Sequence, residues 1–91
     1  MYIKPCPKCG RNPKIHDCIS NLKFKNGIRR RLCMCPGYCS VIPREDKLYT
    51  FCFEYDGEGD DNVIYKEWNA AIQCYLDNAN KPWYEREYKW R

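Results

Sequence analysis

The sequence predicts a small α+β fold of the zinc-ribbon kind, with an antiparallel sheet of three to four strands and one C-terminal amphipathic helix. Three observations lead to this fold class. Two pairs of closely spaced cysteines are separated by 25 residues, which is room for a two-stranded hairpin. Strand-like segments separated by turn residues fill the first 55 positions. Beyond residue 62 the apolar residues change to the spacing of a helix.

The length and the cysteine content suggest that the core needs support. The chain has 91 residues, the size of one domain, and eight cysteines. A chain of this length buries only about 60–65% of its unfolded surface, so disulfides or a metal ion commonly add stability. The sequence shows neither the apolar segment of a signal peptide nor a membrane span. We therefore expect a cytoplasmic protein with no membrane association, in which spaced cysteines bind metal.

Three short segments predict the first part of the sheet. Residues 1–5 are expected to form a short strand that leads into the first cysteine pair. Residues 13–19 alternate in polarity and predict a second strand. Asn26 and Gly27 form a strong hairpin-turn signal, so residues 28–35 are the expected antiparallel return strand.

The second half of the chain supplies one more strand and the helix. Residues 48–55 are aromatic and β-branched and predict one continuous strand, followed by a loop over residues 57–62. The helix should start with Asp61 or Asn62 as its cap and end near residues 78–80. Its expected buried face comprises Ile64, Trp68, Ala71, Ile72, Tyr75 and Leu76.

The chain divides into a zinc-ribbon domain with its helix, residues 1–80, and an aromatic and basic tail, residues 81–91. We expect the aromatic rings of the tail to pack against the sheet, because a small core needs apolar area. A short helix, or a surface that stacks on nucleic-acid bases, is the alternative.

The first cysteine pair stands in KPCPKCGR. Gly10 can adopt a positive φ, which turns backbone N–H groups toward the sulfurs of Cys6 and Cys9 and makes negative charge there less costly. A redox role for this pair requires a helix that starts at the first cysteine, and Gly10 and Pro13 exclude such a helix. The pair is therefore interpreted as one half of a metal site.

The second pair, Cys35 and Cys39, flanks a Pro-Gly-Tyr turn and completes the zinc-ribbon pattern C-x2-C-x25-C-x3-C. Cys33 lies two residues before Cys35 and is the alternative third ligand, although its spacing to Cys39 is outside the usual range. The spacing rule favours Cys6, Cys9, Cys35 and Cys39. Four thiolates fill a tetrahedral site, so we expect one structural zinc ion.

No set of catalytic residues emerges, so we expect no enzyme. The chain has a single histidine, His16, and no glycine-rich phosphate loop. Cys18, Cys52 and Cys74 stand alone and are interpreted as small buried hydrophobic residues.

Positive charge is concentrated in the first half of the chain. Residues 1–50 carry eleven Lys and Arg against three Asp and Glu, and residues 51–91 carry five against nine. The basic residues of the expected hairpin could contact phosphates of DNA or RNA or a protein partner, although a solvated surface explains them equally well. These candidates are Lys23, Lys25, Arg29, Arg30 and Arg31.

Three separated segments resemble the Lar restriction-alleviation family, which consists of small zinc-ribbon proteins of phages, prophages and bacteria. The segments are KPCPKCG, the second cysteine pair, and EWNAAI of the expected helix; together they span roughly residues 2–72. The second pair departs from the family pattern by one extra residue and by Ser40 in place of glycine. The matching residues are Lys4, Pro5, Cys6, Pro7, Cys9, Gly10, Trp68 and Asn69.

The resemblance implies an anti-defence function in the host cytoplasm, in which phage DNA is protected from restriction. The implied partner is a host enzyme, for example a restriction–modification system. A chain of net charge +4 with three consecutive arginines is not an acidic mimic of DNA. The alternative function is a nucleic-acid-binding zinc ribbon that uses the basic hairpin of residues 23–31.

Overall fold

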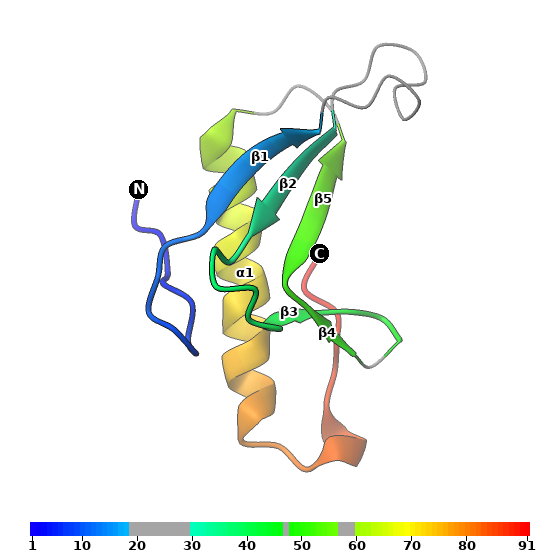
Figure 1. Ribbon diagram of the computed structural model, residues 1–91. Coiled ribbons are helices and arrows are strands. Elements are labelled where there is room, and N and C mark those ends of the chain that lie inside the picture. Colours follow the sequence, from blue (N-terminus) through cyan, green and yellow to red (C-terminus); the bar gives the residue numbers. More distant parts are fainter. Residues whose placement is uncertain (19–29, 47, 57–59) are drawn as a thin grey trace.

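The computed structural model describes residues 1–18, 30–46, 48–56 and 60–91, which form two antiparallel sheets and one long helix (Figure 1). The larger sheet has the strand order β1-β2-β5, and the smaller sheet pairs β3 with β4. The predicted α+β ribbon fold, with a three-stranded antiparallel sheet and one helix, is confirmed. The elements are β1 Lys14–Cys18, β2 Arg30–Met34, β3 Ile42–Pro43, β4 Tyr49–Thr50, β5 Cys52–Asp56, α1 Asp61–Ala79 and a short 3₁₀ turn, η1 Trp83–Glu85.

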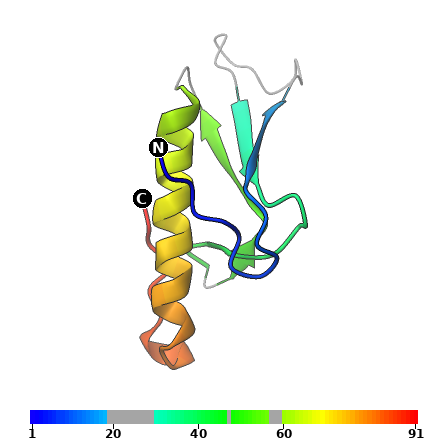
Figure 2. The same ribbon diagram turned by 90° about the vertical axis from the view of Figure 1, so that its left-hand side faces the viewer.

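One row of side chains crosses the larger sheet and builds the core. Ile15 of β1 is opposite Cys33 of β2, and Cys33 is opposite Phe53 of β5. Residues directly opposite one another place their side chains on the same face, so these three share one face. Cys33 and Phe53 are buried and Ile15 packs against the same cluster, to which residues of α1 also belong. Helix α1 lies beside this sheet (Figure 2).

Helix α1 buries the face that the apolar spacing predicts, with one exception. Its fully buried apolar residues are Ile64, Trp68, Ala71 and Ile72, whereas Leu76 is exposed. The cap is Asp60, one residue before the predicted Asp61 or Asn62. Asp60, in an extended conformation, accepts a hydrogen bond from the Val63 N–H, so Asp61 already belongs to the first turn.

Two strand predictions are wrong. Residues 1–5 form no strand. The Asn69 side chain accepts a hydrogen bond from the Lys4 N–H and donates one to the Tyr2 C=O, so these backbone groups pair with a side chain and not with a strand. Residues 48–55 form two strands in different sheets, broken at Phe51. At this break the Phe51 C=O accepts a hydrogen bond from the Cys35 N–H, so the backbone of Phe51 holds the second cysteine pair in place.

The tail packs back on the protein, as its aromatic content predicts. Trp90 lies edge-on to Phe53, with ring centroids 5.0 Å apart, and its indole N–H donates to the Pro43 C=O. Tyr88 contacts Tyr49 in the same edge-on manner. The first part of the tail, including Trp83, is exposed. The tail and the N-terminal arm lie on opposite flanks of α1 (Figures 1 and 2).

Among the described residues, no helix combines the length and the apolar character that a bilayer crossing requires.

Candidate metal centre

The first cysteine pair lies on a tight loop that the backbone itself closes. The Cys6 N–H donates to the Arg11 C=O and the Gly10 N–H donates to the Cys6 C=O, both at 2.8 Å. Gly10 has the positive φ that the sequence predicts, 74°. A Cβ at this position would meet no other atom, so the glycine is needed for its backbone conformation and not for space.

The second pair is held by the strand break at Phe51. The Cys35 N–H donates to the Phe51 C=O, and the Tyr38 N–H donates to the Cys35 C=O and closes the turn. Tyr38 itself has φ 56°, in the left-handed region that residues other than glycine rarely adopt. The turn therefore fits between the two cysteines only because Tyr38 accepts this conformation.

The two loops bring four sulfur atoms together. The Sγ atoms of Cys6, Cys9, Cys35 and Cys39 all lie within 4.8 Å of one another, and this group could hold a metal ion. The Sγ atoms of Cys9 and Cys35 are 3.4 Å apart, well beyond the ~2.05 Å of a disulfide bond. A tetrahedral zinc site with Zn–S bonds of about 2.3 Å separates its sulfurs by about 3.8 Å, so the donor set fits such an ion.

The thiols of this cluster differ in acidity because their surroundings differ. The backbone N–H of Arg11 lowers the pKa of the exposed Cys9 thiol to about 7. Burial raises the pKa of the Cys6 thiol, and desolvation raises that of Cys39 to about 12. A cation bound among the four sulfurs would favour the thiolate form of each of them.

Cys33 lies apart from the cluster. Strand β2 ends at Met34, so the alternation that would place Cys33 and Cys35 on one face stops before Cys35. The Cys33 side chain is buried in the core beneath α1, where burial raises its pKa to about 12. Cys33, the alternative third ligand, is therefore a buried thiol of the core, and Cys35 joins the cluster in its place.

Helix α1 fixes the chain segment that enters the first loop. The Trp68 indole N–H donates to the Lys4 C=O at 2.7 Å. The Asn69 side chain accepts from the Lys4 N–H and donates to the Tyr2 C=O, both at 2.8 Å. Trp68 and Asn69 thus anchor the arm two residues before Cys6. This role of Asn69 was not predicted, because the two partners are more than 60 residues apart in the sequence.

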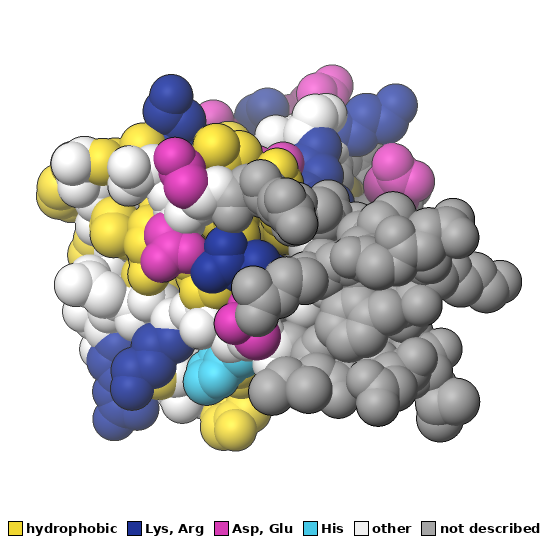
Figure 3. Space-filling view, turned by 90° about the horizontal axis from the view of Figure 1, so that it is seen from above, with side chains coloured by type: hydrophobic (Ala, Val, Ile, Leu, Met, Phe, Trp, Pro, Cys, Tyr) yellow, Lys and Arg dark blue, Asp and Glu magenta, His cyan; other side chains and the backbone are white. Residues whose placement is uncertain are grey.

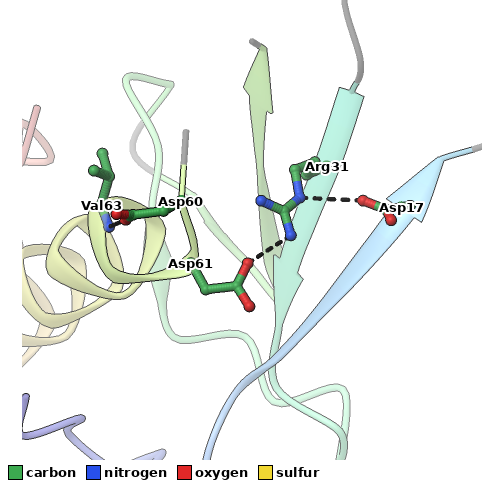
Figure 4. Close-up of polar contacts among 5 residues, drawn as sticks. All are labelled: Asp17, Arg31, Asp60, Asp61 and Val63. Carbon is green, nitrogen blue, oxygen red and sulfur yellow. Dashed lines mark hydrogen bonds and ion pairs between the residues drawn. The ribbon is translucent and has the colours of Figure 1, made fainter. Parts of the chain in front are cut away.

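Two of the five predicted hairpin residues are described, and both form ion pairs within the protein. Arg31 lies between β1 and the start of α1, where its guanidinium reaches Asp17 at 3.1 Å and Asp61 at 2.5 Å (Figure 4). These carboxylates raise the pKa of Arg31. Arg30 pairs with Glu54 at 3.3 Å.

The remaining predicted residues of the hairpin, Lys23, Lys25 and Arg29, lie outside the described residues, as does the expected Asn26-Gly27 turn. At the adjoining end of the molecule the described basic and acidic side chains are interspersed (Figure 3). The described part of this end is therefore not a uniformly basic face.

Among the described side chains, three cysteines lie outside the cluster: Cys33, Cys52 and Cys74. Cys74 is half-buried on α1 and its thiol donates to the backbone C=O of Glu87 in the tail. Cys52 is also half-buried, and the backbone of Cys18 lies in β1. His16 is exposed on β1.

Comparisons with known protein families, with curated proteins and with solved structures found no match for this chain.

Proposed function

We propose that this protein is a zinc-dependent binding protein, in which one structural zinc ion on Cys6, Cys9, Cys35 and Cys39 fixes a surface that meets a partner. The observation that carries the proposal is the convergence of four sulfur atoms from two separate loops. Thiolates are ligands that zinc prefers, and four of them leave no position for water or substrate. The proposal therefore assigns no catalytic role to the metal.

We further propose restriction alleviation as the biological role, with a host restriction–modification enzyme as the partner. Support comes from the residues that carry the resemblance to the Lar family. Lys4, Trp68 and Asn69 contact one another, and the arm that they fix leads directly into the first cysteine pair. The residues that carry the resemblance thus share one structural task, which is to shape the entry into the first cysteine pair.

The alternative role of the 23–31 hairpin in nucleic-acid binding receives no support from its described residues. Arg30 and Arg31 already neutralise carboxylates of the protein itself. Releasing them to bind phosphate would cost those ion pairs.

Metal analysis tests the site. The purified protein is expected to contain one zinc ion per chain, and Cys9→Ser is expected to lose both the ion and the fold, because a structural zinc contributes on the order of 10 kcal/mol. Cys35→Ser should also empty the site, whereas Cys33→Ser should keep the zinc and only lower the free energy of unfolding. The matched control is Cys74→Ser, on a thiol outside the cluster. A filled site in Cys35→Ser would contradict the ligand assignment.

Phage plating tests the biological role. Unmodified phage would be plated on hosts that carry a type I restriction system, with the wild type or Cys9→Ser expressed, beside a matched host that lacks the system. Alleviation predicts that the wild type raises plating only where the restriction system is present, and that Cys9→Ser does not. Unchanged plating would reject this target and leave the zinc site standing.

A further inference from the structure

An exposed aromatic pair lies beside the cysteine cluster and has no role in the core. Tyr38 of the second loop is 67% exposed and Phe51 at the strand break is 36% exposed. Their ring centroids are 5.3 Å apart in an edge-on arrangement. Large aromatic rings usually stabilise a small protein through burial, and these two contribute little in that way.

The backbone of Tyr38 makes this placement more unusual. Its φ of 56° is the conformation that glycine adopts without cost and that asparagine tolerates better than an aromatic residue. The fold alone therefore favours Gly or Asn at this position. Because Tyr38 is exposed and has a disfavoured φ, we infer that its ring is needed to bind a ligand.

The first loop carries two cations, Lys8 and Arg11, and Arg11 lies beside the residue that precedes Tyr38. An Arg11 guanidinium nitrogen lies 3.6 Å from the point where a Cβ on Gly37 would stand, next to Tyr38. Lys8 lies between the two cysteines of the first pair, with its ammonium 5.9 Å from the centre of the Tyr75 ring. Within the described part of the chain neither cation forms an ion pair. The two loops, residues 5–12 and 35–40, contain no Asp or Glu.

We propose that Lys8, Arg11, Tyr38 and Phe51, which we call the knuckle face, bind single-stranded nucleic acid. Bases stack on the two rings and phosphates approach the two cations, the combination by which proteins hold single strands without reading sequence. The two cations stand on the first loop and Tyr38 stands on the second, and the four sulfur atoms bring these two loops together. The proposal depends neither on the 23–31 hairpin nor on restriction alleviation.

Charge distinguishes this face from the second exposed aromatic pair. Trp83 and Tyr84, in η1, are 74% and 68% exposed with ring centroids 5.8 Å apart. Around them Glu85 and Glu87 stand among Lys81, Arg86 and Lys89, so the tail mixes both signs of charge, whereas the two cysteine loops carry cations only. Tyr84 therefore serves as a matched control for Tyr38.

The two cations have a competing explanation, which is that they offset the charge of a tetrathiolate zinc site. That explanation predicts that Lys8→Gln/Arg11→Gln loosens zinc without affecting nucleic-acid binding. It gives no reason for the exposed rings. Measuring zinc content beside nucleic-acid affinity separates the two explanations.

The experiment is fluorescence anisotropy of the zinc-loaded full chain with labelled oligothymidylate and oligouridylate of about 15 nucleotides, and with a duplex as competitor. We expect single strands to bind more tightly than the duplex. Tyr38→Asn should weaken binding about tenfold or more through the lost stacking. The same change should leave the melting temperature unchanged or raise it, because asparagine suits the local φ.

The salt dependence tests the cations. Lys8→Gln/Arg11→Gln should lower the slope of log affinity against log salt by about 0.7 for each charge removed. Tyr84→Asn and the exposed helix variant Lys66→Gln should leave affinity and slope close to those of the wild type. Preferences between oligothymidylate and oligouridylate decide whether the strand is DNA or RNA.

Three results would each overturn the proposal. The first is the absence of single-strand binding at low salt. The second is an unchanged affinity in Tyr38→Asn with zinc fully bound. The third is an equal loss of affinity in Tyr84→Asn, which would place the contact on the tail.

Discussion

At the scale of single residues, two asparagine side chains of α1 make the hydrogen bonds that a neighbouring strand would make in a sheet. The Asn69 side chain donates to one backbone C=O and accepts from one backbone N–H of the N-terminal arm. Asn78, which is buried, does the same with the N–H and C=O of Glu87 in the tail. Each side-chain amide thus provides hydrogen-bond partners for one N–H and one C=O of a segment that pairs with no strand. Asparagine side chains therefore hold both the N-terminal arm and the tail against α1.

Asn69→Ala tests how much the two hydrogen bonds to the N-terminal arm contribute. The variant leaves the Tyr2 C=O and the Lys4 N–H without their partner, so the free energy of unfolding should fall by about 1–2 kcal/mol. The arm that precedes Cys6 should also become looser, so a chelator should remove zinc faster than from the wild type. Denaturant unfolding and the rate of zinc transfer to a chromogenic chelator measure the two effects. The control is Asn62→Ala, at an exposed position of the same helix, which should behave as the wild type.

The residues of the candidate metal centre were largely predictable, and the contacts that support them were not. A cysteine loop closes through hydrogen bonds between residues five or fewer apart, so spacing and one glycine are enough to indicate it. The anchoring of the arm by Asn69 joins residues from opposite ends of the chain, and no local pattern indicates such a pair. The left-handed Tyr38 was missed because aromatic residues rarely adopt that conformation.

At the scale of elements, Arg31 joins three parts of the fold. It stands on β2, reaches Asp17 on β1 and reaches Asp61 in the first turn of α1 (Figure 4). Its side chain is 19% exposed and that of Arg30 is 31% exposed, whereas their carboxylate partners Asp61 and Glu54 are both exposed. An ion pair with an exposed partner contributes little by itself, so the importance of Arg31 rests on its joining two elements to β2 at once.

Arg31→Gln should therefore destabilise the protein more than Arg30→Gln. We expect a loss of about 1 kcal/mol in the free energy of unfolding for Arg31→Gln, because both of these ion pairs are lost, and at most about 0.5 kcal/mol for Arg30→Gln. Chemical denaturation at low and high salt measures both variants. Equal effects would show that Arg31 is an ordinary surface cation.

Element type was easier to predict than element continuity. The apolar spacing gave α1 almost to the residue, because a long amphipathic helix repeats its signal over several turns. The strand over 48–55 had the right propensity throughout, and its break at Phe51 comes from a hydrogen bond to Cys35, outside the segment. Strand breaks of this kind depend on distant partners and not on local preference.

At the scale of the whole molecule, the tail completes the core of a protein that is too small to do without it. Trp90 covers Phe53 and donates to the Pro43 C=O, which links the tail to both sheets. Arg91 donates to the Glu54 C=O and pairs with Glu67 on α1 at 3.2 Å. The tail is therefore part of the folded unit, as its aromatic content predicts.

Trp90→Ala should lower the free energy of unfolding by about 2–3 kcal/mol, somewhat less than for a fully buried tryptophan. Trp83→Ala removes the same side chain from an exposed position and should change stability by no more than about 0.5 kcal/mol. Thermal and denaturant unfolding of the zinc-loaded variants compare them. Equal losses would show that the tail contributes little packing.

The position of the cysteine cluster along the chain has a consequence for synthesis on the ribosome. All four sulfur donors lie within the first 39 residues, and the helix that covers the sheet starts only at residue 61. A nascent chain thus exposes a complete set of metal ligands before its hydrophobic core can form. Metal capture should come first and helix docking second, so the ion would guide the order of folding as well as stabilise its end point. Zinc retention by ribosome-stalled chains that have not yet exposed α1 would reveal this order.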